Sequence, residues 1–176
     1  MLRYCTLRAL TKPPGTQYLF GGKLRFETNG RVVWICVSRS CAGQNQGGID
    51  CSGLAEYGAV NACFVRGVSS IAGLAVRNMV ASAAGQAQYF ESRDALLDAD
   101  GSPNPGDFVF FKHTTLGSNE DQITHVGIYL GRYTDGTLLI VHASSRAGRV
   151  IFDKLRPGGK LTNKIAGFGD ISILAP

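Results

Sequence analysis

The second half of the chain is patterned for β-strands. From Asp107 onward, short runs rich in Val, Ile, Leu and Phe alternate with polar and glycine-rich stretches, which is typical of strands rather than helices. The pattern predicts five strands, at Phe108–Phe111, Ile123–Leu130, Thr137–Ala143, Arg149–Phe152 and Phe168–Leu174. Because strands that follow one another closely in sequence tend to pair side by side, we expect an antiparallel meander.

A β-hairpin is predicted near the start of the chain. The dipeptide Asn29-Gly30 is a strong signal for a two-residue turn, and it separates two strand-like runs, Leu24–Thr28 and Arg31–Val37. The residues that follow, Ser38–Gly48, are polar and rich in glycine, which favours a loop.

Helices are predicted between this loop and the strands. The stretch from Cys51 to about Phe64 is rich in Ala and Gly on one side, so a helix here could lie close against a sheet. Gly73–Phe90 is expected to form one or two further helices, and Asp98–Gly106 is a turn region. Helices followed by an antiparallel meander define the α+β class, and residues 1–176 are expected to form one domain.

Composition narrows the class of protein. Of the 176 residues, 44% are hydrophobic and 18% are charged, and the formal net charge is +5. This mild charge could favour an anionic partner such as a cell-wall polymer, or it could reflect only a solvated surface. No Lys/Arg block with interleaved aromatic residues indicates nucleic-acid binding. No run approaches the roughly 18 apolar residues that a membrane helix needs.

The first residues carry no visible export signal. Met1–Pro14 has neither a continuous apolar segment nor a clear cleavage site of small residues. Three alternatives follow: the protein stays inside the cell, it is delivered by a machine that needs no such signal, or the sequence is shortened.

The five cysteines, an odd number, leave at least one thiol unpaired within the chain. Cys36 and Cys41 are close enough for a disulfide if a turn lies between them, whereas Cys5 and Cys63 are at least as well interpreted as buried thiols. Cys36 and Cys41 could instead bind zinc together with histidines. Their spacing is looser than in most structural zinc sites, and no matching second pair follows. We therefore expect neither a metal nor a cofactor.

A candidate nucleophile lies at the start of the first predicted helix. In the run Gly48–Leu54, Asp50 is a good N-cap, and Cys51 follows it on the first helical turn. The free backbone N–H groups and the helix dipole there favour a thiolate, so we expect the pKa of Cys51 to be lowered. The same N–H groups could hold an oxyanion.

Two histidines are candidates for the base and its orienting partner. His125 and His142 lie on neighbouring predicted strands, and their alternation places both side chains on one face. A tight Asp135-Gly136 turn would leave them four residues apart, whereas a six-residue loop, Gly131–Gly136, would set them directly opposite each other. Only the longer loop makes a working pair, so we predict it. His125 would then take the proton of Cys51, and His142 would orient His125.

These residues stand in motifs that resemble those of the NlpC family of papain-like cysteine peptidases, the bacterial cell-wall hydrolases. The resemblance covers about residues 15 to 155 and has four parts in the family's order. These are Tyr18–Gly22, Asp50–Leu54, Pro105–Phe111, and His125–Gly131 followed by His142–Ser145. Each motif alone is weak or moderate, and together they are strong.

The resemblance implies a papain-like α+β fold, in which the nucleophile helix packs on a C-terminal antiparallel sheet. It implies a Cys51–His125–His142 triad that hydrolyses amide bonds in peptidoglycan stem peptides, often between D-glutamate and diaminopimelate. By the same carry-over, Tyr18 should line the substrate site, and Asp50 and Ser52 should shape the floor of the cleft.

The chain also departs from the family pattern. Lys23–Ile49 is longer than the usual link, so a hairpin and loop are inserted at about residues 23–49, and the loop His113–Gln122 also looks enlarged. These insertions affect the expected specificity more than the chemistry. The lack of a wall-anchoring module and of an export signal suggests a delivered antibacterial effector, with an immunity or inhibitor protein as a partner, or a phage-type wall hydrolase. The rival functions are acyl transfer to another substrate and non-catalytic binding to the cell wall.

Overall fold

The structure is a computed structural model that describes residues 16–26, 32–38, 48–64 and 82–174. Two helices and eight strands occur in these residues, together with two short 3₁₀ turns. In chain order they are β1 (Gly22–Phe26), β2 (Val32–Cys36), α2 (Cys51–Phe64), α4 (Ala83–Glu91), β3 (Leu96–Leu97), β4 (Phe108–Lys112), β5 (Ile123–Arg132), β6 (Leu138–Ser144), β7 (Arg149–Leu155), η2 (Thr162–Lys164), β8 (Ile165–Gly169) and η3 (Ile171–Leu174). The α+β class is confirmed.

Six strands form one antiparallel sheet in the order β3-β8-β4-β5-β6-β7. The predicted meander is confirmed for β4 to β7, whereas β8 crosses back to pair with β4. The prediction of a strand over Phe168–Leu174 is wrong beyond Gly169. The Asp170 carboxylate accepts a hydrogen bond from the Ser172 N–H at 2.8 Å, and this local turn starts η3 in place of further strand.

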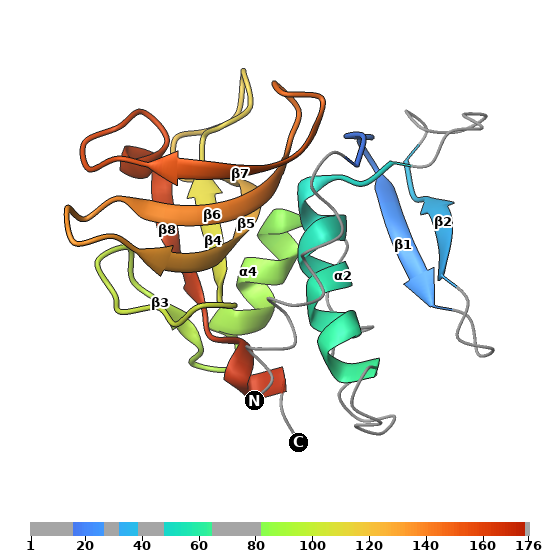
Figure 1. The fold of residues 1–176 in the computed structure, drawn as a ribbon, viewed down its shortest axis with the longest axis horizontal. Helices are drawn as coiled ribbons and strands as arrows, with labels where there is room; N and C mark the ends of the chain where they lie inside the picture. The colour runs from blue at the N-terminus through green and yellow to red at the C-terminus, as the bar shows by residue number, and fades with distance from the viewer. Residues whose placement is uncertain (1–15, 27–31, 39–47, 65–81, 175–176) are drawn as a thin grey trace.

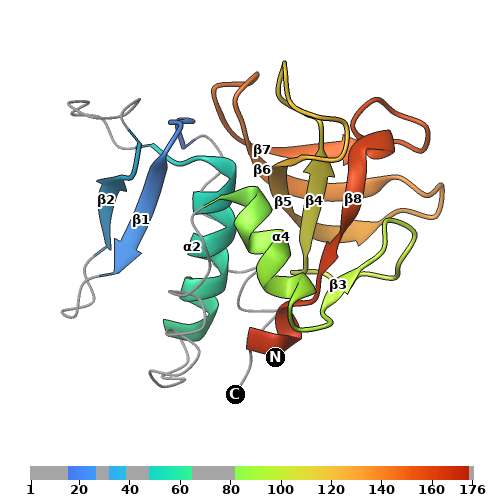
Figure 2. The same ribbon diagram turned by 180° about the vertical axis from the view of Figure 1, so that it is seen from behind.

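The two helices cover one face of the sheet, as Figures 1 and 2 show from opposite sides. Their buried side chains and those of the facing strands form one core cluster, which includes Leu54, Phe90, Phe108, Phe110 and Val126. Side chains on the opposite side of the strands form a second cluster, which includes Val109, Phe111, Tyr129, Ile140 and Phe168. The strands are therefore buried on both sides, so packing holds the sheet in place on both of its faces.

Helix α2 has the predicted bounds, from Cys51 to Phe64. The small residues Gly53, Ala55 and Ala59 on it are buried, as expected for a helix that lies close to its neighbours. Of the helices predicted over Gly73–Phe90, α4 confirms the last part, and residues 73–81 lie outside the described residues. Ser82 caps α4 by accepting a hydrogen bond from the Gly85 N–H at 3.1 Å.

The predicted hairpin is confirmed as the strand pair β1–β2, with Phe26 opposite Val32. Its predicted turn, Asn29-Gly30, lies outside the described residues. The hairpin packs against α2 on the side away from the six-stranded sheet (Figures 1 and 2). Helix α2 thus lies between the sheet and the hairpin, so its first turn can be contacted from both.

Candidate active site

The first turn of α2 is fixed by its N-cap residue. The Asp50 carboxylate accepts a hydrogen bond from the Gly53 N–H at 2.7 Å, which confirms Asp50 as the cap. Cys51 is the first residue of the helix and is partly exposed. Cys51 packs against the core cluster that includes Val126, and the Val126 backbone lowers the pKa of its thiol, so Cys51 faces β5, the strand that carries His125.

A short segment before β1 brings Tyr18 to the start of α2. Tyr18 forms a bridge with Ile49, and its N–H donates to the Gly148 carbonyl oxygen at 2.8 Å. Partial burial, together with the charges of Cys51 and Asp50, raises the pKa of Tyr18 to about 12. The phenol is therefore close to Cys51, where the family resemblance places it, and it stays protonated at neutral pH.

The two predicted histidines are hydrogen-bonded to each other. The Nε2 atom of His125 lies 2.7 Å from the Nδ1 atom of His142, and the two rings are nearly perpendicular, at 80°. Phe111, opposite His125 on β4, packs against the His125 ring with a centroid distance of 5.7 Å. Both imidazoles are therefore held in defined orientations.

The strand register that brings the histidines together differs from the prediction. Ile128 pairs with Val141, and a β-bulge at Leu130 shifts the pairing so that Arg132 faces Leu138. The predicted six-residue loop and the direct pairing of His125 with His142 are both wrong. Continued along the strands, the observed register places Gly127 opposite His142, so the two imidazoles meet diagonally.

Gly127 leaves the space for this diagonal contact. A Cβ atom at this position would lie 3.3 Å from the Cβ of His142 and 3.2 Å from the carbonyl oxygen of Val141. Diagonal neighbours in a sheet are about 7–8 Å apart, which is within reach of two imidazole rings when no side chain stands between them.

Asp153 on β7 is an additional residue near the pair. One of its carboxylate oxygens lies 3.7 Å from His142 Nε2, which is too long for a hydrogen bond. Burial lowers the pKa of His142, and the Asp153 charge partly opposes this change. The sequence analysis missed Asp153, although strand alternation places it diagonally from His142 once Ile151 is known to face His142.

The pKa of Cys51 moves in the direction opposite to the prediction. Burial raises it to about 11, and the charge of the neighbouring Asp50 adds to the rise. Backbone hydrogen bonds from Val126 and Ser52 and the Lys23 charge act in the predicted direction, but desolvation outweighs them. Burial and the nearby His142 lower the pKa of His125 to about 3. At neutral pH, Cys51 therefore rests as a thiol and His125 as a neutral imidazole.

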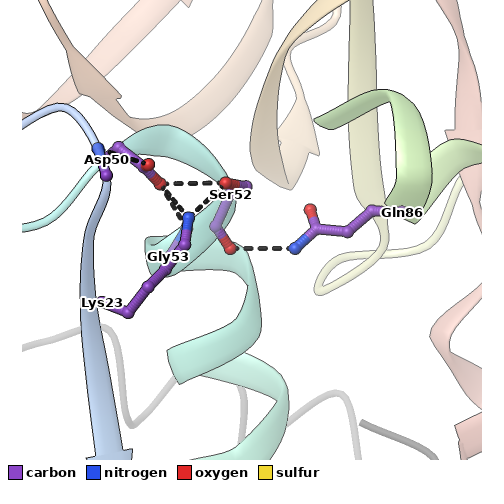
Figure 3. Close-up of polar contacts among 6 residues, drawn as sticks. Lys23, Asp50, Ser52, Gly53 and Gln86 are labelled. Atoms are coloured by element: carbon purple, nitrogen blue, oxygen red, sulfur yellow. Dashed lines mark hydrogen bonds and ion pairs between the residues drawn. The ribbon is translucent and has the colours of Figure 1, made fainter. Parts of the chain in front are cut away.

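A buried polar network lies at the start of α2, as Figure 3 shows. The Ser52 hydroxyl donates to Asp50 Oδ1 at 2.9 Å, and the Lys23 ammonium contacts both residues at 2.5 Å. From α4, the Gln86 amide donates to the Ser52 carbonyl oxygen at 2.9 Å. The sequence assigned Asp50 and Ser52 to the floor of the cleft, which stays a prediction. It gave no indication of Lys23 and Gln86, since a lysine in a hairpin strand and a glutamine in a helix give no local signal.

The cysteines outside the candidate site could bind a metal or form a disulfide. In the part of the chain that the structure describes, no group of three or more His, Cys, Asp or Glu side chains could hold a metal ion. The side chain of Cys36 and the whole of Cys41 lie outside the described residues, and so does the disulfide that the sequence left open between them.

Two helices packed on one face of a six-stranded antiparallel sheet define the papain-like α+β class of fold. Within that class, a family model for NlpC/P60 matches residues 15–164, so the chain belongs to the NlpC/P60 family. This is a family of cysteine peptidases and amidases. Membership supports hydrolysis of peptidoglycan and action outside the cytoplasm. Across the described residues, no helix is long and apolar enough to cross a membrane.

One solved structure confirms the fold. An N-acetylmuramoyl-L-alanine amidase from Bacteroides uniformis is similar over 96% of this chain and 97% of its own, with a TM-score of 0.55 and 17% sequence identity. A candidate xylanase from Bacteroides fragilis has 20% identity over 62% of this chain and 61% of its own, and its TM-score of 0.26 is too low to indicate a shared fold. A comparison with curated proteins gives no match.

Proposed function

We propose that this protein is a cysteine peptidase or amidase that hydrolyses amide bonds in peptidoglycan stem peptides. Cys51 is the nucleophile, His125 is the general base and acid, and His142 orients His125. The observation that carries the proposal is the 2.7 Å hydrogen bond between the two imidazoles, since His125 lies on the strand that Cys51 faces.

Proton transfer in this site accompanies attack on the substrate. Since the pKa of Cys51 is raised and that of His125 is lowered, the thiol keeps its proton until a carbonyl carbon is in place. His125 Nε2 is bonded to His142, so Nδ1 is the nitrogen that accepts the thiol proton. As the S–C bond forms, the C–N bond breaks and His125 returns the proton to the leaving amine. Water then hydrolyses the thioester, with His125 again as the base.

Charge that develops on the carbonyl oxygen has donors nearby. The backbone N–H groups at the start of α2 are aligned with the helix dipole, and they favour negative charge there. The Tyr18 phenol, whose pKa is raised to about 12, remains a hydrogen-bond donor throughout the neutral range. Tyr18 therefore lines the substrate site, and Asp50 and Ser52 support it from below.

The bond between D-glutamate and diaminopimelate is the substrate bond that the family resemblance favours. The net charge of +5 suits a polymer whose stem peptides carry carboxylates. For the biological setting, we propose an effector or phage-type hydrolase that acts in the periplasm or cell wall. An effector of this kind would have an immunity or inhibitor protein as a partner.

Digestion of purified peptidoglycan fragments tests this function. The wild type should release new fragments whose masses identify the bond cleaved, and Cys51→Ala should release none. An acyl transferase would give products only with an added acceptor amine or alcohol, and a wall-binding module would retain fragments without cleaving them. Cleavage by Cys51→Ala at the wild-type rate would contradict the proposal.

A further inference from the structure

Lys23 is a fully enclosed cation beside the nucleophile. It lies on β1, in the inserted hairpin, and only 2% of its surface is exposed. Its ammonium group lies 2.5 Å from Asp50 Oδ1 and 2.5 Å from the Ser52 hydroxyl oxygen (Figure 3). These two residues flank Cys51 in sequence, so a charge from the hairpin reaches the residues on both sides of the thiol.

The backbone holds Lys23 tightly in this position. The Gly21 N–H donates to Asp50 Oδ2 at 3.0 Å, and the Asp50 N–H donates to the Gly22 carbonyl oxygen at 3.0 Å. A Cβ atom at Gly53 would lie 2.6 Å from that carbonyl oxygen and 2.9 Å from Lys23 Cδ. The start of β1 is therefore pressed against the first turn of α2, and the lysine cannot swing into solvent without separating them.

The charge on Asp50 opposes the reaction that the site performs. Asp50 is 7% exposed, and its carboxylate disfavours a thiolate on Cys51, whereas the Lys23 charge favours one. The other titratable groups around the thiol are Tyr18 from the preceding segment and His125 on β5, with His142 on β6 behind it. Of these described groups, the Lys23 ammonium is the positive charge that lies against Asp50.

We propose that Lys23 is a positioning residue for catalysis: it holds the N-cap carboxylate and cancels its charge, so that the Cys51 thiolate forms beside a neutral pair. The inference rests on the proposed function for the role of Cys51 as nucleophile. With this role for Lys23, the inserted hairpin takes part in the chemistry as well as in specificity. If the ion pair had only a structural role, removing its charges would act on stability and not on the Cys51 thiolate. A buried pair can often be replaced by neutral groups without loss of stability.

Alkylation of Cys51 by iodoacetamide tests the proposal without any peptidoglycan. Below the pKa of a thiol, the alkylation rate is proportional to its thiolate fraction, so one unit of pKa change alters the rate tenfold. The rate is measured at pH 7 and pH 8 in the wild type, Lys23→Met, Asp50→Asn and the double variant. Tandem mass spectrometry locates the label at Cys51, and Cys51→Ala gives the background from the other cysteines.

The account predicts that Lys23→Met slows alkylation by about tenfold and that Asp50→Asn accelerates it. Asparagine still caps the helix, so the second change removes charge more than structure. The double variant should lie within about threefold of the wild type, because both charges are absent. Lys112→Met, which removes an exposed pair with Asp121, is the matched control and should leave the rate unchanged.

Failure of this proposal and failure of the proposed function would give different results. An unchanged or faster rate in Lys23→Met would overturn the proposal. If Lys23→Met does not fold, the comparison of Asp50→Asn with the double variant decides. Loss of Lys23 from the Asp50→Asn protein should again slow alkylation about tenfold. Equal alkylation rates in these two variants would overturn the proposal. If the pattern holds but wall fragments are not cleaved, the proposed function fails while the role of Lys23 in charge compensation stands.

Discussion

His125 and His142 are hydrogen-bonded at 2.7 Å although they are not opposite each other in the sheet. They meet diagonally across Gly127, after a bulge at Leu130 has shifted the strand register. The orientation of the general base therefore depends on a position with no side chain, and this dependence can be tested.

Gly127→Val should disrupt the histidine pair. A Cβ at this position already lies 3.3 Å from His142 Cβ, and the two methyl groups of valine would enter the path between the imidazoles. We expect kcat on muropeptides to fall about a hundredfold, with a loss of about 1–3 kcal/mol in stability from overpacking. Gly127→Ala should give a smaller loss of kcat, and equal activity of the alanine, valine and wild-type proteins would contradict the account.

His142→Gln should lower kcat about a hundredfold to ten-thousandfold with little change in KM, because the variant removes the group that orients His125. The matched control is His113→Gln. His113 lies in an exposed loop, where its ring contacts the Ser118 carbonyl oxygen, and its loss should leave kcat unchanged. Steady-state kinetics on a defined stem peptide measures both variants. Equal losses in the two would show that His142 has no special role.

Burial of His125 should make stability depend on pH below neutrality. Its pKa is about 3 in the folded protein, and an unfolded histidine titrates at about 6.5. Between these values the unfolded chain binds more protons, so this contribution is complete above about pH 6.5 and is lost as the pH falls. We expect urea denaturation to show about 2 kcal/mol less stability at pH 5 than at pH 7 from this residue. His125→Gln should have a shallower dependence, and an unchanged dependence would contradict the assigned burial.

Ser82→Ala should reduce stability without changing the chemistry. The variant removes the cap of α4, which costs about 1 kcal/mol. Because α4 packs behind the site and does not supply the nucleophile or base, kcat should stay within about twofold of the wild type. Thermal unfolding and peptide cleavage measured on one preparation separate the two effects. A loss of kcat as large as that of His142→Gln would indicate that the site responds to global stability.

Local sequence signals predicted the elements that carry the site. The N-cap at Asp50 and the run of small residues after it defined α2 to its observed bounds, and alternation identified the strands of both histidines. These features depend on residues within a few positions of each other. The resemblance to the NlpC family then indicated which of the candidate residues act together in one site.

Features set by long-range packing could not be predicted. The bulge at Leu130 depends on how β5 and β6 fit the whole sheet, so a loop-length argument chose the wrong register. The raised pKa of Cys51 depends on its burial, to which the sequence gives no direct access. Lys23 reaches Asp50 across 27 residues, and only the folded hairpin reveals that contact.

Muropeptide cleavage by the His125→Ala/His142→Ala double variant tests the central claim most directly. If His142 acts only through His125, its removal has no further effect once His125 is absent, and the double variant should cleave at the rate of His125→Ala alone. Losses that multiply in the double variant would contradict the account, because each histidine would then act on the substrate independently.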